Sequence, residues 1–104
     1  MQKFDEIFEV VKLIPSGRVT SYGAIAKYLN TGARLVGWAM NSSHFLDIPA
    51  HRVVNFKGVL TGKNHFETPD TMQNKLESEG IIIKNDQILN FKSCFWDPVV
   101  ELEI

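Results

Sequence analysis

The hydrophobic and polar positions of this chain follow the period of an α-helix from its first residues. Between Phe4 and Ile14, apolar residues recur at steps of three and four, which places them on one face of an amphipathic helix. Pro15 and Gly17 interrupt this pattern and end the predicted helix.

A second helix is predicted after the short extended segment Arg18–Thr20. Ser21 or Thr20 can cap its N-terminus, because a hydroxyl oxygen accepts a hydrogen bond from an unpaired backbone N–H of the first turn. The segment Asn30–Gly32 ends the helix and turns the chain. The inward face is predicted to comprise Ile25, Ala26 and Leu29.

A third helix is predicted from Ala33 to about Ser43, with one apolar face and one mixed face. Glycine within a helix costs about 1 kcal/mol relative to alanine, and such a glycine often serves packing or close approach. The apolar face comprises Val36, Ala39 and Met40, and the opposite face comprises Arg34, Gly37, Trp38 and Asn41.

The second half of the chain predicts two hairpins and one helix. Short apolar runs flank Asn55–Gly58, which favours a hairpin there. Thr68–Pro69 is typical of a helix start, and Gly80 of a helix end. A second hairpin turns at Asn85–Asp86. The aromatic and acidic tail is expected to pack in part and to fray at its end.

Together these elements predict a mainly α (α+β) fold. Two helices joined by a short glycine-containing turn and followed by a hairpin resemble a helix-turn-helix with a wing. The length of 104 residues predicts one domain, residues 1–104.

Composition and charge narrow the chemistry. Net charge is -1, which argues mildly against coating nucleic acid by bulk attraction but leaves room for a small basic face. The single cysteine, Cys94, excludes an internal disulfide and favours a reducing cytoplasm. His44, His51 and His65 lack zinc-site spacing, so no metal or cofactor is expected. No apolar run has the length of a membrane span, and the acidic N-terminus does not resemble a signal peptide.

Four blocks carry a resemblance to a known family. They read IPSGRVTSYGAIAKYL, ARLVGWAM, IPAHRVVNFKGVLTG and LESEG. In order and spacing they resemble the DNA-binding domain of the O6-alkylguanine-DNA alkyltransferases. The resemblance spans residues 4–84 approximately, and the tail from about residue 85 is not covered by it.

The enzymes of this family carry Pro-Cys-His-Arg, whose cysteine accepts the alkyl group. Here the corresponding residues are Pro49-Ala50-His51-Arg52. Dealkylation requires a thiolate nucleophile, and alanine has neither a lone pair nor an ionisable group. The chain therefore resembles the alkyltransferase-like proteins, which bind and flip O6-alkylguanine in duplex DNA, transfer nothing and flag the lesion for nucleotide excision repair.

The resemblance also implies residue roles on the DNA-facing side. Arg34 corresponds to the finger that fills the gap left by the flipped base, and Tyr22 to the tyrosine that helps to rotate the nucleotide. Thr20 and Ser21 are candidates for phosphate contacts, although helix capping is an equal alternative. Gly37 corresponds to a close approach of the DNA backbone. The remaining predicted DNA contacts are Asn41 and Trp38, and Trp38 departs from the small or basic residue usual in the family.

The predicted base pocket comprises Met40, Ser43, Pro49, Ala50 and Val53. His51 and Glu79 correspond to the pair that activates the cysteine through water in the enzymes, so here they are a relay without a nucleophile. Arg52 is expected to make structural hydrogen bonds below the site. Loop residues 61–64 are expected to close over the base.

Three functions stay open on the sequence alone. The first is a monomeric, cytoplasmic and nucleoid-associated sensor of alkylated guanine in double-stranded DNA, without enzymatic activity. The second is an alkyltransferase-type enzyme with altered activity. The third is a helix-turn-helix regulator of transcription that binds undamaged DNA. Transfer of label from alkylated DNA to the protein distinguishes the second from the first, and equal affinity for damaged and undamaged duplexes favours the third.

Overall fold

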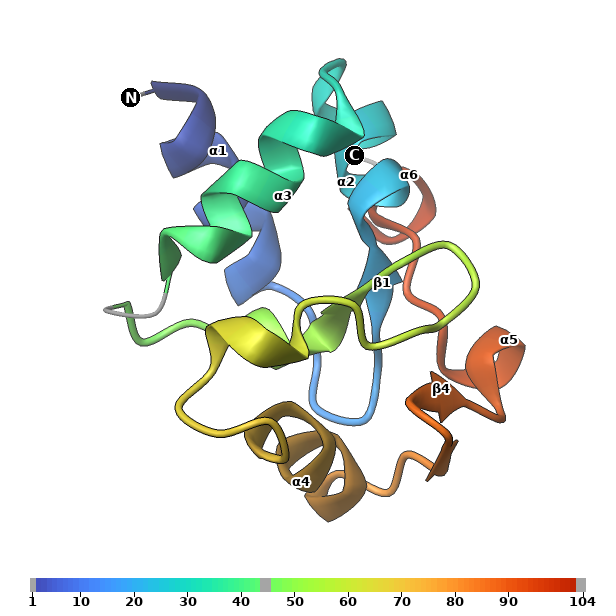
Figure 1. The fold of residues 1–104 in the computed structure, drawn as a ribbon. Helices are drawn as coiled ribbons and strands as arrows, with labels where there is room; N and C mark the ends of the chain where they lie inside the picture. The colour runs from blue at the N-terminus through green and yellow to red at the C-terminus, as the bar shows by residue number, and fades with distance from the viewer. Residues whose placement is uncertain (1, 44–45, 103–104) are drawn as a thin grey trace.

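The computed structural model describes residues 2–43 and 46–102, within which short helices surround two small β-pairings (Figure 1). The α-helices are α1 (Gln2–Lys12), α2 (Tyr22–Leu29), α3 (Ala33–Asn41), α4 (Thr71–Ser78), α5 (Phe91–Cys94) and α6 (Pro98–Glu101). Single 3-10 turns form η2 (Ala50–Arg52) and η3 (Lys63–His65). The strands are β1 (Thr20–Ser21), β2 (Val53–Val54), β3 (Ile83–Lys84) and β4 (Gln87–Ile88).

Helices α1, α2 and α3 pack around the first hydrophobic cluster, as their apolar spacing predicts. Ile7, Val11 and Ile14 supply the buried face of α1 and the turn after it, and each is at most 1% exposed. Figure 1 shows α3 lying across α1 and beside α2. The mainly helical fold with few short strands is confirmed.

The turn between α2 and α3 follows the predicted chemistry. Ser21 caps α2, since its Oγ accepts a hydrogen bond of 3.0 Å from the N–H of Ala24. Asn30 ends the helix in the left-handed region with φ 56°, a conformation that asparagine tolerates better than most residues. The N–H of Thr31 then bonds the carbonyl of Ala26 at 2.9 Å. This closure holds α3 against α2 in the expected helix-turn-helix arrangement.

Helix α4 begins later than predicted but ends where predicted. Thr68 and Pro69 lie in a turn before the helix, and the Thr68 hydroxyl lies 2.9 Å from the Thr71 hydroxyl. Gly80 has φ +90° and completes a Schellman motif, in which Ile81 N–H bonds Leu76 C=O at 3.2 Å. The sequence therefore located the helix end better than its start, because the end depends on one residue that tolerates positive φ.

The strands correct one of the two predicted hairpins. The residues before Asn55 form β2, which pairs in parallel with β1 (Thr20↔Val53, Ser21↔Val54) and not with the segment after the turn. Asn55 closes a tight loop, since its Oδ1 accepts from the N–H groups of Lys57 and Val59. The second hairpin is confirmed: β3 and β4 are antiparallel, and both turn residues, Asn85 and Asp86, have positive φ.

The tail packs more extensively than predicted. Trp96 is 3% exposed and belongs to the first cluster, while its N–H bonds Val19 C=O at 2.7 Å. Arg18 clamps the same segment by donating to the carbonyls of Cys94 and Phe95. The predicted fraying concerns residues 103–104, which lie outside the described residues. Within the described ranges, no helix has both the length and the apolar character needed to span a membrane.

Candidate nucleic-acid interface

A cavity of about 110 Å³ opens between the end of α3, η2, the η3 loop and α4. Four of the five predicted pocket residues lie in its wall: Met40, Ser43, Ala50 and Val53. The fifth, Pro49, is half-buried beside Ala50 and does not contribute to the lining. Tyr22 and Asn41, predicted as DNA contacts, also line this cavity.

Helix α4 and the η3 loop supply pocket residues that sequence reasoning missed. Thr71 and Lys75 are four residues apart and therefore share a face of α4. The loop expected at residues 61–64 contributes Gly62, and its wall continues beyond the expected range. The other missed lining residues are Leu46, Ile48, His65, Phe66, Glu67 and Met72. The helical spacing of Thr71 and Lys75 puts them on one side of α4, but no signal in the sequence shows that this side borders the cavity.

Two close contacts join residues that line the cavity, one between Ser43 and Met40 and one between Gly62 and Tyr22. The hydroxyl of Ser43 donates to the carbonyl of Met40 at 2.7 Å, so its hydrogen is already used and its oxygen remains available as an acceptor. A Cβ added to Gly62 would lie only 3.0 Å from the hydroxyl of Tyr22. Gly62 therefore lets the η3 loop approach Tyr22 closely over the cavity mouth.

The outer face of α3 carries Arg34, Gly37, Trp38 and Asn41 away from the core. Arg34 is exposed, and its side chain makes no hydrogen bond or ion pair with another described residue. Trp38 is 55% exposed. A Cβ at Gly37 would meet no heavy atom within 4 Å, so nothing inside the described protein requires glycine there. The side chains of Arg34 and Trp38 are therefore accessible to an external partner.

The phosphate contact predicted for the Thr20 side chain is inconsistent with its burial. Thr20 is 0% exposed because β1 lies beneath the surface, paired with β2. Its hydroxyl has no hydrogen-bond partner among the described residues. Ser21 is 6% exposed, and its side chain serves the capping alternative.

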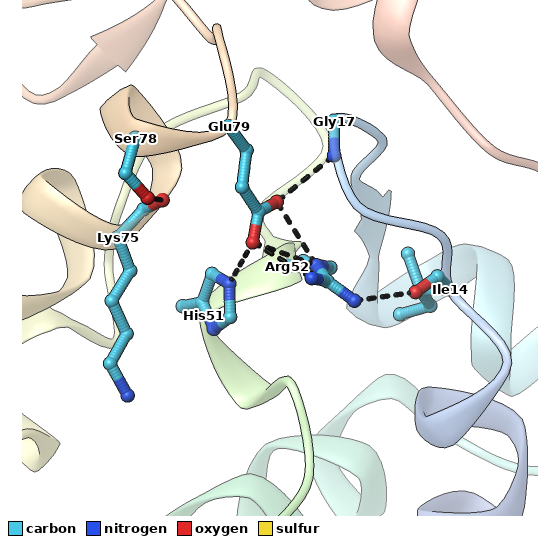
Figure 2. Close-up of polar contacts among 7 residues, drawn as sticks. All are labelled: Ile14, Gly17, His51, Arg52, Lys75, Ser78 and Glu79. Atoms are coloured by element: carbon cyan, nitrogen blue, oxygen red, sulfur yellow. Dashed lines mark hydrogen bonds and ion pairs between the residues drawn. The ribbon is translucent and has the colours of Figure 1, made fainter.

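Glu79 is the centre of a network of ion pairs and hydrogen bonds with His51, Arg52 and Gly17 (Figure 2). His51 Nε2 lies 2.8 Å from Glu79 Oε2, and Arg52 donates to both carboxylate oxygens. Arg52 also donates to Ile14 C=O at 2.8 Å, and Gly17 N–H donates to Glu79 Oε1 at 3.0 Å. The network ties α4 to η2 and to the turn after α1, as expected for a structural role of Arg52.

The network fixes the protonation of its members. Burial alone would raise the pKa of Glu79, but hydrogen bonds from Arg52, Gly17 and His51 outweigh it and lower that pKa to about 2. Burial lowers the pKa of His51 below 6.5 despite the Glu79 carboxylate, and the charges of Arg52 and Lys75 lower it further. Neutral His51 therefore donates from Nε2 to Glu79 and keeps Nδ1 as an acceptor.

The side chains around the cavity include no thiol. Cys94 is 5% exposed in the second hydrophobic cluster and is not part of the cavity wall. Burial raises the pKa of its thiol, which disfavours the reactive thiolate. Over residues 2–43 and 46–102, no group of three or more His, Cys, Asp or Glu side chains is arranged to hold a metal ion. His44, considered in the zinc argument, lies outside those ranges.

Comparison with known proteins places this geometry in a family context. The family model described as "6-O-methylguanine DNA methyltransferase, DNA binding domain" matches residues 2–81. This range contains all four sequence blocks and the cavity.

Two relatives and one solved structure resemble almost the whole chain. Alkyltransferase-like protein 1 of Schizosaccharomyces pombe is 31% identical over 102 residues, covering 91% of this chain and 94% of its own. A DNA base-flipping protein of Vibrio parahaemolyticus is 34% identical over 96 residues, covering 89% and 94%. The crystal structure of S. pombe Atl1 with damaged DNA containing O6-carboxymethylguanine matches with a TM-score of 0.81 and 31% identity, covering 94% and 98%.

Proposed function

The chain belongs to the family defined by the DNA-binding domain of 6-O-methylguanine DNA methyltransferase, and from this premise we propose that it is a non-enzymatic sensor of O6-alkylguanine. The sensor binds duplex DNA, accepts the extruded damaged base in the cavity beside Ala50 and releases it unchanged. The observation that carries this proposal is a cavity whose wall holds Ala50, at the position where the family's enzymes hold the reactive cysteine.

Base extrusion has a cost that the interface must offset. Unstacking and unpairing one nucleotide costs a few kcal/mol, and less when the base is already mispaired by damage. Arg34, exposed at the start of α3, is suited to enter the stack in place of the base. Tyr22 at the cavity mouth is suited to crowd the rotating nucleotide, and Gly37 allows the DNA backbone to approach α3.

The cavity can hold a base by contacts that do not react with it. Met40 and Val53 offer apolar walls, while the Ser43 oxygen and the backbone near Val53 offer hydrogen-bonding atoms for the edge of guanine. Asn41 adds an amide at the rim. Ala50 leaves the space near the alkyl group open without supplying a nucleophile.

The His51–Glu79 pair then has a structural use. In an enzyme such a pair would draw a proton from a thiol, but the wall here has none. The pair instead fixes η2 against α4, which sets the position of Ala50 in the cavity. The same contacts would allow a thiol introduced at position 50 to meet a prepared base.

We further propose that residues 1–104 act as one domain and as a monomer located with DNA in the cytoplasm and nucleoid. Since the sensor leaves the lesion in place, another protein must repair it. We propose that nucleotide excision repair proteins recognise the complex of the sensor with damaged DNA. Pull-down with purified repair proteins on lesion-containing duplex tests this part separately from lesion binding.

The experiment that tests the absence of chemistry uses duplex DNA labelled on the O6-methyl group. After incubation, denaturing electrophoresis separates protein from DNA. We expect all label to stay with the DNA and the complex to dissociate on dilution. Label on the protein would establish an alkyltransferase and contradict the sensor.

A pair of Arg34 variants tests the finger. Arg34→Lys keeps a cation that can contact phosphate but loses the planar guanidinium that can stack in the helix. We expect both Arg34→Ala and Arg34→Lys to reduce the preference for the lesion, with unfolding curves like the wild type because Arg34 is exposed. Full lesion preference in Arg34→Lys would reduce Arg34 to a phosphate contact.

A further inference from the structure

The exposed tryptophan on α3 is a feature that base flipping alone does not explain. Trp38 is 55% exposed, whereas the second tryptophan, Trp96, is 3% exposed in the core. The Trp38 ring makes no ring–ring or cation–ring contact with another described residue. A large aromatic side chain left in water on a contact surface is typical of a binding residue.

Helical geometry places Trp38 on the proposed DNA face, and Trp38 does not line the cavity. At 3.6 residues per turn, Arg34, Gly37, Trp38 and Asn41 fall within an arc of about 100°, opposite the buried Val36 and Ala39. Of the two α3 residues that line the cavity, Met40 lies about 160° and Asn41 about 60° from Trp38 around the helix. Because Trp38 itself is outside the lining, its indole is placed to meet the duplex beside the base pocket.

The small number of cations on the proposed DNA face leaves a need for uncharged contacts with DNA. The chain has 11 basic and 12 acidic residues, and α2 and α3 together contain only Lys27 and Arg34 as cations. Affinity from counterion release scales with the number of phosphates neutralised, so the contribution from α2 and α3 is small. Apolar and stacking contacts with nucleotides do not depend on salt in this way.

We propose that Trp38 is a lesion-independent anchor, whose indole packs against the unflipped part of the duplex outside the cavity. This inference rests on the proposed function and gives two separate binding roles to residues of the DNA face. The residues near the cavity select the lesion, and Trp38 adds affinity for any duplex.

These two roles predict how variants behave in paired titrations with O6-methylguanine and guanine duplexes. Trp38→Ala weakens both affinities by about tenfold, the size of a lost aromatic contact, and leaves their ratio unchanged. The slope of log affinity against log salt also stays unchanged, because no cation is lost. Trp38→Lys raises the slope by about one phosphate contact and does not restore affinity at high salt.

Fluorescence provides a direct readout because one tryptophan is exposed and the other buried. Subtracting the Trp38→Phe protein from the wild type isolates the Trp38 emission, which neutral acrylamide quenches in the free protein. Either duplex is expected to shift this emission and to protect it from acrylamide. Sedimentation velocity without DNA is expected to show the same species for wild type and Trp38→Ala.

The outcomes separate this inference from the proposed function. If the wild type prefers the lesion but Trp38 stays accessible to acrylamide in the complex, the anchor is refuted and the sensor stands. A Trp38→Ala protein that loses only lesion affinity places the indole in lesion selection and also refutes the anchor. A dimer that disappears in Trp38→Ala makes the surface a contact between copies. Wild type without lesion preference contradicts the sensor and this inference together.

Discussion

Replacing Glu79 by glutamine is the sharpest test of the network around Glu79. The Glu79 side chain is 11% exposed and accepts hydrogen bonds from Arg52, Gly17 and His51. Glutamine keeps the size of the side chain but removes the charge, and its NH2 group faces donors. Arg52, whose side chain is 17% exposed, would lose its ion-pair partner.

The loss of stability in Glu79→Gln can be worked out in two ways. Lowering the pKa of Glu79 from 4.5 to about 2 corresponds to about 3 kcal/mol of stability, at about 1.4 kcal/mol per pH unit. Removing one partner of a buried ion pair costs about 3–5 kcal/mol when the other charge is stranded. Arg52 keeps its bond to the Ile14 carbonyl, which limits the loss. We therefore expect Glu79→Gln to lower the free energy of unfolding by about 3 kcal/mol.

The lowered pKa of Glu79 determines how its contribution to stability changes with pH. The unfolded state binds the proton more readily than the folded state, so the Glu79 contribution is fully present above the unfolded pKa of 4.5. It decreases as pH falls below 4.5 and is lost below about 2, the pH at which folded Glu79 is half protonated. Carboxyl-carbon NMR of the wild type measures this midpoint directly.

The assay is urea unfolding at pH 7.5, followed by circular dichroism. Glu77→Gln is the matched control, because Glu77 is an exposed acid in the last turn of α4 whose side chain accepts a hydrogen bond from the Gln73 amide. We expect a change of about 0.5 kcal/mol or less in that control. Equal small losses in both variants, or a Glu79 midpoint near 4.5, would refute the reasoning about the network.

Four further predictions follow from single positions. Gly37→Ala should stabilise the fold by about 1 kcal/mol in urea unfolding yet weaken DNA binding; unchanged affinity would exclude close backbone approach. Ala50→Cys should accept labelled methyl once per molecule, using neutral His51, and an unlabelled A50C protein would show misalignment of the relay. The imidazole resonances of His51, identified by their loss in His51→Gln, should titrate below pH 6.5, so that folding stability falls as pH drops below that value; a midpoint above it would contradict its burial. Trp96→Ala should cost about 3–5 kcal/mol, and a loss below about 1 kcal/mol would exclude the tail from the core.

The helical half of the fold could be predicted from the sequence because local rules determine it. The spacing of Ile7, Val11 and Ile14, the Ser21 cap and the Asn30 turn each act within a few residues. The Asn85–Asp86 turn is local in the same sense. These features could be predicted correctly because none of them depends on contacts between residues far apart in the sequence.

The rest depends on partners far apart in sequence. Thr20 is buried because it pairs with Val53, 33 positions away, and no local pattern announces a two-residue parallel pairing. Lys75 enters the cavity wall only because α4 packs against η2. Trp96 fills the first cluster from a tail that the family motifs do not cover. The base pocket beside Ala50 was predicted from the family resemblance, and hydrophobic periodicity alone could not have predicted it.

The central claim is that this fold distinguishes an alkylated guanine while leaving it intact. Equilibrium titration of the wild-type protein with two duplexes, identical except for one O6-methyl group and compared at one salt concentration, tests it most directly. The account predicts tighter binding to the methylated duplex, with the methyl group still on the DNA recovered from the complex. Equal affinity for the two duplexes, or recovered DNA that has lost its methyl group, would contradict it.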